Sequence, residues 1–387
     1  MFVKKKAMMK ILTIFYLVML LFLSNGCQNK KKEISPVYKQ KIDSLFIAHY
    51  SQDLFHGGVV ISHNGEILYE NYLGLANRGW DFPFDKDVKL DIASVNKSII
   101  AALVLKAVEE GRLNLEDKLV NLLTGFSYEG SFHPEITLHH MLSHSSGLPD
   151  YDGVAEDLKL NQFSPFKRQR FTNEGYVDFI SKIEPINTPG QQFYYSNFAY
   201  HLLPIILEET YQKPFSEILK EKLTLPLGLK NTVSESKNEV VISKLAKAYN
   251  YQEKTGQWHQ NLFIDLSLGR RIFSTASDLN RWAQVMDNPG WLTAKSLQLM
   301  QQNHQAEIDE NFSYGYGWVV IGGANRSRMV DLGIQQPYII HGGSTEGYKA
   351  MLININKGEY VISFLSNVGN RTEEIQLAQQ IVNILIK

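Results

Sequence analysis

The sequence is short of three features that would each define a class of protein. It has one cysteine, Cys27, among 387 residues, which excludes intramolecular disulfides and zinc sites built on cysteine. It has no excess of positive charge, because 39 basic residues are matched by 40 acidic ones. No nucleic acid is therefore expected as a partner, since such binding depends on displacing phosphate counterions. The apolar run at residues 11–23 is too short for a membrane-spanning helix, which needs roughly 20 residues.

The first residues of the chain instead have the pattern of a targeting segment. Lysines precede the apolar run, and Ser24, Asn25 and Gly26 then lead to Cys27. A positively charged start, a short apolar core and small residues at its end are typical of a secretory signal peptide.

The position of Cys27 directly after small residues resembles a bacterial lipobox. This resemblance implies cleavage before Cys27 and a lipid-anchored lipoprotein of the bacterial cell envelope that faces the periplasm or the exterior. Two acyl chains on this residue would anchor the protein stably, whereas one would not. Residues 1–26 are then the signal peptide and residues 27–35 a solvated tether. The alternative is a plain signal peptide or membrane anchor in which Cys27 has no role.

Strand patterns lie at both ends of the remaining domain, residues 36–387. Two β-rich runs flank Asn64-Gly65, and this arrangement predicts a hairpin. The strands are expected at residues 58–63, 66–70, 316–321, 338–341, 348–355 and 360–366, and helices at 42–49, 94–110 and 372–386. The predicted fold class is α+β, with an antiparallel sheet built from N- and C-terminal segments. Helices flank this sheet, and a mostly helical insertion is expected at roughly residues 112–265.

The first candidate for chemistry is the segment Ser94-Val95-Asn96-Lys97. On a helix, positions i and i+3 share a face, so the Ser94 hydroxyl and the Lys97 ammonium can meet. A serine hydroxyl needs a base to become a strong nucleophile, and lysine is such a base when burial lowers its pKa toward neutrality. If Ser94 starts the helix, its N–H also favours an oxyanion nearby. Taken alone, such a tetrapeptide is more often a capping serine with a surface lysine.

The second candidate is Tyr195-Ser196-Asn197, which lies between a Pro189-Gly190 turn and an apolar helical pattern. One interpretation is a packed Tyr195 and an Asn197 that caps the following helix. The other places the phenol of Tyr195 near a cation, which lowers its pKa and lets it relay protons.

The third candidate is His341-Gly342-Gly343-Ser344, at the end of a strand pattern. Glycines at this place let a substrate backbone approach the edge of the strand. The N–H of Ser344 is a candidate donor to an oxyanion. Taken alone, the segment is equally a Gly-Gly hairpin turn.

Together the three segments resemble the superfamily of serine β-lactamases and penicillin-binding DD-peptidases. The resemblance is to the branch of class C β-lactamases, D-amino-acid peptidases and family VIII esterases, and it covers about residues 40–387. The three segments occur in the family's order. Supporting stretches are residues 142–149 (LSHSSGLP), 227–232 (LGLKNT), 273–278 (FSTASD) and 314–318 (YGYGW).

The resemblance implies a β-lactamase-related serine hydrolase that uses neither a cofactor nor a metal. Ser94 would be the nucleophile that forms an acyl-enzyme. Lys97 and Tyr195 would share the role of general base, and which of them takes the first proton stays open. The substrate would be a small molecule or peptide with an amide or ester bond: a D-amino-acid peptide, a small ester or a β-lactam.

The resemblance also implies a set of substrate-binding groups. Asn197 would hydrogen-bond the amide of the substrate, and His341, Gly342 and Gly343 would line the site. The N–H groups of the nucleophile and of Ser344 would form the oxyanion hole.

Several residues depart from the family pattern. His341 stands where classical β-lactamases have a lysine, and a histidine mostly lacks that permanent charge at pH 7, which argues against efficient β-lactam hydrolysis. Arg270 and Arg271 stand where relatives often have glycine, either to meet an anionic substrate or, more commonly, at the surface. No metal site is expected at the group His139, His140 and His144, because no acidic residue lies between them.

The alternative to an enzyme is a membrane-tethered, penicillin-binding-like protein that senses or binds a ligand without turnover. The unusual His341 and the two arginines favour this alternative. The complete set of proton-transfer residues favours the hydrolase.

Overall fold

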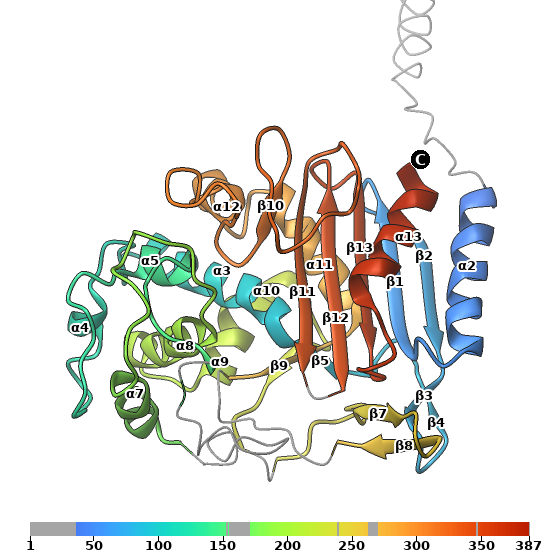
Figure 1. Cartoon of the computed structure of the whole chain (residues 1–387), viewed down its shortest axis with the longest axis horizontal. Coiled ribbons are helices and arrows are strands. Elements are labelled where there is room, and N and C mark those ends of the chain that lie inside the picture. The colour runs from blue at the N-terminus through green and yellow to red at the C-terminus, as the bar shows by residue number, and fades with distance from the viewer. Residues whose placement is uncertain are drawn as a thin grey trace, which may run out of the picture. The chain divides into compact units, whose positions relative to one another are not determined.

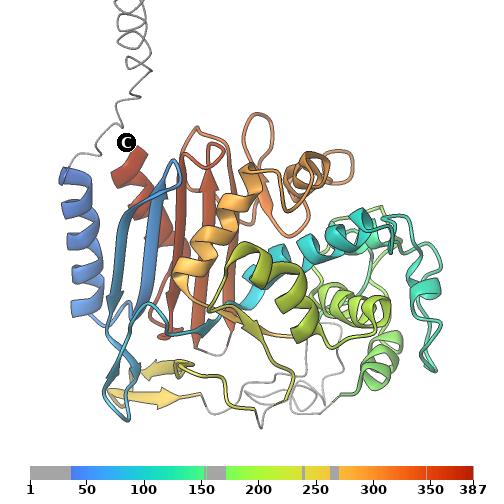
Figure 2. The same ribbon diagram turned by 180° about the vertical axis from the view of Figure 1, so that it is seen from behind.

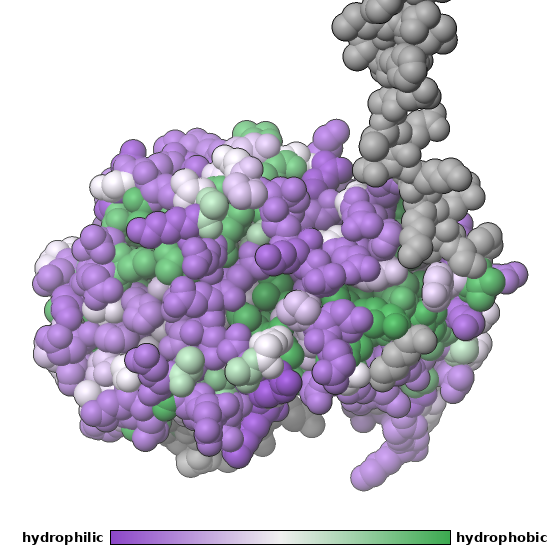
Figure 3. All heavy atoms as spheres, turned by 90° about the horizontal axis from the view of Figure 1, so that it is seen from above, coloured by the Kyte–Doolittle hydropathy of each residue, from purple (hydrophilic) through white to green (hydrophobic). Residues whose placement is uncertain are grey.

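The computed structural model of the chain describes residues 36–151, 154, 171–237, 240–261, 270–345 and 347–386. Cys27, the expected signal peptide and the expected tether lie outside these residues. Among the helices of the described ranges, none combines the length and the apolar character needed to cross a membrane. Seen from above in Figure 3, the described surface is mostly hydrophilic, with hydrophobic side chains gathered in several patches.

A six-stranded antiparallel sheet joins the two ends of the described chain. Its strand order is β10-β11-β12-β13-β1-β2, so the late strand β13 pairs with the early strand β1. The strands are β1 (Gly57–His63), β2 (Glu66–Leu73), β10 (Val319–Ile321), β11 (Tyr338–Thr345), β12 (Tyr348–Ile355) and β13 (Tyr360–Ser366). The predicted sheet from N- and C-terminal segments is confirmed (Figure 1). The predicted hairpin is present as well, with Asn64 and Gly65 both at positive φ.

Strand β11 differs from the expected strand at its end. It continues past His341 to Thr345, with Gly342 paired to Met351 and Gly343 paired to Ala350. The two glycines therefore lie inside a strand, and the interpretation as a Gly-Gly hairpin turn is wrong. Pairing with the whole length of β12 supplies the hydrogen bonds that keep the glycines extended.

Helices cover both faces of the sheet (Figures 1 and 2). Helices α2 (Pro36–Ser51) and α13 (Glu374–Ile386) lie on one face, and α11 (Ala276–Gln284) lies on the other. Because successive side chains of a strand point to opposite faces, Ile353 packs in a cluster with Phe46 and Ile381, whereas Leu352 packs in a cluster with Leu279. Burial on both faces explains why the central strands are almost continuously apolar.

A mostly helical region adjoins the sheet. Its centre is α3 (Asn96–Glu109), in which every residue from 97 to 105 is buried, and α3 packs against α8 (Asn197–Tyr211). The other helices of this region are α4 (Leu119–Leu122), α5 (Leu138–Leu142), α7 (Asn173–Ser181), α9 (Phe215–Leu219), the π-helical turn η4 (Lys220–Thr224) and α10 (Leu225–Leu227). Helix α3 starts at the six-stranded sheet and ends among these helices. Its first turn therefore lies where the two layers of the fold, the sheet and the helical region, meet.

Short elements connect the two layers. A three-stranded sheet is formed by β5 (Leu90–Asp91), β9 (Ile272–Ser274) and β6 (Val233–Ser234), in the order β5-β9-β6. The remaining elements are β3 (Leu75–Asn77), β4 (Phe82–Pro83), β7 (Tyr249–Gln252), β8 (Gln257–Gln260), the 3-10 turns η1 (Ala93–Val95) and η5 (Val285–Asp287), and α12 (Ala294–Gln301).

Gly317 shows how closely the chain passes the first turn of α3. Its φ is +74°, and a Cβ atom at this position would lie 2.6 Å from the carbonyl oxygen of Lys97 and 2.6 Å from Cα of Ser98. Both contacts are to backbone, which cannot swing away. Only glycine fits this approach.

We expect Gly317→Ala to lower the free energy of unfolding by about 3 kcal/mol, because a strained left-handed residue and a steric overlap add up. Gly323→Ala is the matched control, since Gly323 also has positive φ but faces open space. The control should lose only about 1 kcal/mol. Urea unfolding followed by tryptophan fluorescence measures both values, and equal losses would contradict the role of close packing at Gly317.

Candidate active site

Ser94 lies in a strained turn between β5 and α3. The turn η1 contains Ala93, Ser94 and Val95, and the α-helix itself begins at Asn96. Ala93 has a φ of +46°, which is rare for a residue with a side chain. Its N–H donates a hydrogen bond of 2.7 Å to Oδ1 of Asp91. The turn thus places Ser94 just ahead of α3 rather than as the first residue of the α-helix.

Lys97 follows one turn later and is 2% exposed. Its Nζ lies 3.3 Å from Oγ of Ser94 and 2.8 Å from Oδ1 of Asn197. Burial lowers the pKa of Lys97 to about 7, against the opposing influence of the Asp150 carboxylate. A substantial fraction of Lys97 is therefore neutral near pH 7, with a lone pair available beside the serine hydroxyl.

Tyr195 joins the same cluster from the loop before α8. Its hydroxyl is hydrogen-bonded to Ser94, and Nζ of Lys97 lies 4.9 Å from the centre of its ring. Burial and, to a smaller extent, Asp150 raise the pKa of Tyr195, and the hydrogen bond with Ser94 only partly opposes them. The expectation of a lowered pKa is wrong, because the loss of water around the phenol outweighs its neighbours. Tyr195 keeps its proton at neutral pH.

Asn197 faces Lys97 because another residue caps its helix. The cap of α8 is Ser196, whose Oγ accepts from the N–H of Ala199 and donates to the carbonyl oxygen of Pro149. The interpretation of Asn197 as the cap is therefore wrong. As the first residue of α8, Asn197 directs its Oδ1 to Lys97 and its Nδ2 to Asp150.

Asp150 is a site residue that the sequence did not reveal. Its Oδ2 accepts from Nδ2 of Asn197 at 3.0 Å, and its Oδ1 accepts from the backbone N–H of Asn197 at 3.2 Å. Burial raises the pKa of Asp150. The hydrogen bonds that Asp150 accepts and the charge of Lys97 oppose this effect but do not cancel it. Its only signal in the sequence is its place directly after the supporting stretch at residues 142–149.

Strand β11 passes directly beside the turn of Ser94. A Cβ atom at Gly343 would lie 2.6 Å from the carbonyl oxygen of Ile92 and 3.1 Å from the backbone nitrogen of Ser94. Only a glycine allows this approach, and it brings Ser344, the next residue of the strand, to the neighbourhood of Ser94. Gly342 precedes this contact in the same strand.

His341 lies in the same strand as Ser344 but is buried. One ring nitrogen, Nε2, lies 3.0 Å from the hydroxyl of Tyr314, and the other, Nδ1, lies 2.7 Å from the carbonyl oxygen of Gly342. Burial and, next, the charge of Lys97 lower the pKa of His341 to about 3. His341 is therefore a neutral group at the pH values at which the protein would work, and it supplies no cation to a substrate.

Arg270 and Arg271 are only 12% and 16% exposed. The more common outcome named above, arginines exposed at the surface, is therefore not what the structure shows. Nη2 of Arg270 lies 2.9 Å from Oε2 of Glu208, with both side chains less than 14% exposed. Arg271 pairs with Asp91 at 2.6 Å, and the side chain of Asp91 is 1% exposed. Both arginines directly precede the short strand β9. This strand pairs with β5, which ends shortly before the turn of Ser94.

The three histidines considered as metal ligands have separate partners. Nδ1 of His139 lies 2.7 Å from the hydroxyl of Tyr316, His140 forms a capping box with Thr137, and Nδ1 of His144 accepts from the N–H of Ser196. In the described ranges, no three histidine, cysteine or acidic side chains converge as a metal site would require.

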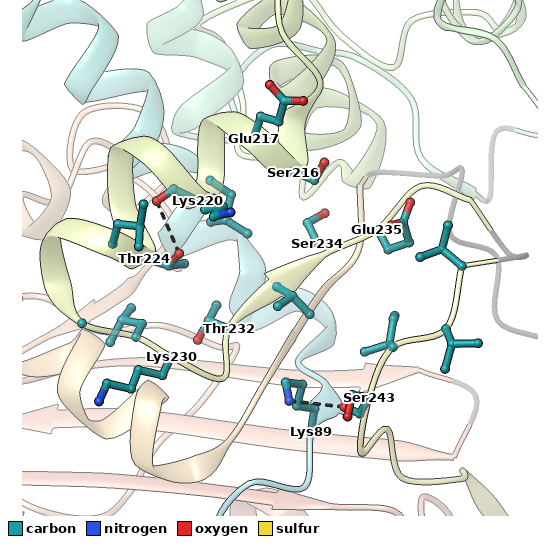
Figure 4. A pocket seen from close by; sticks show the side chains of 18 residues that line it. Lys89, Ser216, Glu217, Lys220, Thr224, Lys230, Thr232, Ser234, Glu235 and Ser243 are labelled. Atoms are coloured by element: carbon teal, nitrogen blue, oxygen red, sulfur yellow. Dashed lines mark hydrogen bonds between the residues drawn. The ribbon is translucent and has the colours of Figure 1, made fainter.

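A cavity of about 670 Å³ lies elsewhere, beside α9, η4 and β6 (Figure 4). Lys89, Lys220 and Lys230 line it together with several aliphatic side chains. None of the candidate site residues named above takes part in its lining, so its size says nothing about the chemistry at Ser94.

A family model described as Beta-lactamase matches residues 43–385. The chain belongs to the beta-lactamase family. A penicillin-binding protein is similar to it in sequence, and a D-amino acid amidase is similar to it in fold.

Two sequence relatives and one solved structure show the extent of the similarity. Penicillin-binding protein 4* of Bacillus subtilis (strain 168) is 25% identical over 361 residues, which are 89% of this chain and 74% of that protein. Protein flp of Staphylococcus aureus (strain MW2) is 24% identical, and the match covers 86% of this chain but only 64% of that protein. The D-amino acid amidase from Ochrobactrum anthropi SV3, solved with L-phenylalanine amide, has a TM-score of 0.73 at 19% identity. The match to the amidase covers 90% of this chain and 98% of that one, and it confirms the shared fold.

Proposed function

We propose that the protein is a serine hydrolase that forms an acyl-enzyme on Ser94. The observation that carries this proposal is the buried Lys97, whose Nζ lies 3.3 Å from Oγ of Ser94 and whose pKa is lowered to about 7. A neutral amine at this distance is the base that a serine nucleophile needs. A surface lysine would keep its proton and could not serve.

In the first half of the proposed reaction, Oγ of Ser94 attacks the carbonyl carbon of an amide or ester and its proton passes to Nζ of Lys97. The carbonyl oxygen becomes an oxyanion, which the N–H groups of Ser94 and Ser344 stabilise. The C–N or C–O bond of the substrate then breaks. The leaving group takes a proton from the hydroxyl of Tyr195, and Tyr195 is replenished from Lys97.

In the second half, water attacks the ester of Ser94 and gives its proton to the same pair of residues. The ester bond breaks, Ser94 regains its proton, and the acid product leaves. In this proposal Lys97 takes the first proton and Tyr195 passes it on as a proton donor, and the lowered pKa of Lys97 and the raised pKa of Tyr195 support this order. No cofactor enters either half.

The proposed substrates are D-amino-acid peptides or amides and small esters. Oδ1 of Asn197 accepts from Lys97 and its Nδ2 donates one hydrogen to Asp150, and in this proposal the second hydrogen of Nδ2 bonds the amide of the substrate. The neutral His341 offers no charge to the carboxylate of a β-lactam, which makes β-lactams the poorer candidates. The amidase of similar fold supports an amide substrate by analogy only.

The proposal includes a place in the cell. Cys27 would carry lipid and hold the enzyme at a membrane of the bacterial envelope, facing the periplasm or the exterior.

We expect Ser94→Ala to lower the rate of hydrolysis about 10³-fold or more across a panel of D-amino-acid amides, small esters and benzylpenicillin. Ser98→Ala is the control, because Ser98 lies one turn away and bonds the carbonyl oxygen of Val95 and the indole of Trp282. Intact mass of residues 28–387 over time detects the acyl-enzyme. An adduct on the Ser94→Ala variant, or equal rates for wild type and variant, would refute the assignment. A stoichiometric ligand without turnover in the wild type would favour the binding protein instead.

The rate of acylation should rise as the pH increases through about 7, as Lys97 loses its proton. Asp150 stabilises the charged form of Lys97, so Asp150→Asn should lower the pKa of Lys97 and move this acid limb to lower pH. Stopped-flow acylation between pH 5 and 9 measures both curves. A limb that stays in place, or that moves to higher pH in the variant, would contradict Lys97 as the base.

Cys27→Ser should abolish lipidation, because the chain has no other cysteine. In a bacterial host fed an alkyne-labelled fatty acid, the wild type should take up label and sediment with membranes. Equal partitioning of the variant and the wild type would remove the anchor from the proposal.

A further inference from the structure

We infer that Arg271 is a positioning residue that holds the two halves of the oxyanion hole in register. The inference rests on the proposed function, because it concerns the N–H groups of Ser94 and Ser344. Arg271 itself touches neither reacting atom. It acts through the residues that flank these two serines.

One contact of Arg271 fixes the turn before Ser94. Its Nη1 donates to Oδ2 of Asp91 at 2.6 Å, and Oδ1 of the same carboxylate accepts from the N–H of Ala93 at 2.7 Å. Ala93 is the left-handed residue directly before Ser94. A left-handed alanine is unfavourable on its own and persists only where its surroundings hold it. The ion pair orients the carboxylate that does so.

A second contact reaches the strand on the other side of the hole. The same Nη1 lies 3.1 Å from Oγ1 of Thr345, the last residue of β11, which follows Ser344 directly. One nitrogen of one guanidinium therefore connects the segment before Ser94 to the segment after Ser344. The planar guanidinium fixes such directions, whereas the flexible ammonium of a lysine does not.

The backbone of Arg271 is held independently of its side chain. Its carbonyl oxygen accepts from Oγ of Ser234, a residue that Figure 4 shows in β6. The next residue, Ile272, accepts from the N–H of Ile92 at 3.1 Å, and Asp91 pairs with Phe273 across the short sheet. Shortening the side chain should therefore leave the strand in place while removing the contacts with Asp91 and Thr345.

The adjacent Arg270 provides the matched control. Its side chain is 12% exposed against 16% for Arg271, and it also pairs with a carboxylate, that of the partly buried Glu208. Glu208 belongs to α8, on the helical side of the molecule. Arg270→Met and Arg271→Met thus each remove a partly buried ion pair of similar exposure, in different places.

The first test compares reaction rates with binding. Arg271→Met should slow acylation of Ser94 by an ester on the order of 10²-fold, the loss typical of one displaced oxyanion donor. Its affinity for a boronic acid, which forms a tetrahedral adduct on Ser94, should fall by a similar factor. KM for the ester should change little, and Arg271→Lys should lie between the variant and the wild type. Arg270→Met should acylate at nearly the wild-type rate even if it is less stable to urea.

The second test does not depend on activity. With ¹⁵N-serine labelling, Arg271→Met should shift the amide signals of both Ser94 and Ser344, and Arg270→Met should shift neither. Wild-type rates in Arg271→Met, or unchanged signals of the two serines, would overturn the inference while leaving the proposed function intact. A wild type that no ester acylates would instead overturn the proposed function, and the amide signals would still decide the positioning role.

Discussion

The burial of the amine of Lys97, which is 2% exposed, is the constraint on which the site depends. A charged ammonium in an apolar interior is costly, so burial alone favours the neutral form of Lys97. The lysine lies on α3, which is buried from residue 97 to residue 105, and the two polar neighbours of its Nζ, Ser94 and Asn197, offset part of this cost. The Asp150 carboxylate, which lies beyond Asn197, stabilises the charged form of Lys97 and so opposes part of the effect of burial. The balance leaves the amine able to gain and lose a proton near neutral pH.

The same constraint explains why the site lies where the two layers of the fold meet. Ser94 lies in the turn η1 and Lys97 in the first turn of α3. Asn197 begins α8, and Gly342 and Gly343 belong to β11. None of these elements can shift alone, because Gly317 and Gly343 bring neighbouring backbone into direct contact with the first turn of α3 and with the Ser94 turn. The arrangement is therefore rigid at the points where a small displacement would separate the reacting groups.

The sequence predicted the parts of the site that depend on short spacing. Ser94 and Lys97 meet as their i, i+3 spacing predicts, although Ser94 lies in the turn η1 ahead of α3, and the hairpin at Asn64-Gly65 follows from its turn residues. It could not predict Asp150 or the partner of Arg271, because these contacts join residues 47 and 180 positions apart, and no local pattern marks them. The cap at Ser196 and the raised pKa of Tyr195 were missed for a related reason. The hydroxyl of Ser196 bonds Pro149, 47 positions away, and the pKa of Tyr195 is raised by the burial of its phenol, which only the packed structure shows.

The pairing of β13 with β1 has a consequence for how the protein is made. The sheet places a strand that ends at Ser366 next to one that begins at Gly57, so this pair cannot form until the ribosome has added nearly the whole chain. Contacts between such distant segments slow folding, because a long loop must close before any of them forms. The sheet therefore stays incomplete for most of the synthesis of the chain. Under the proposed export, this delay would keep the sheet unfolded until the chain has crossed the membrane.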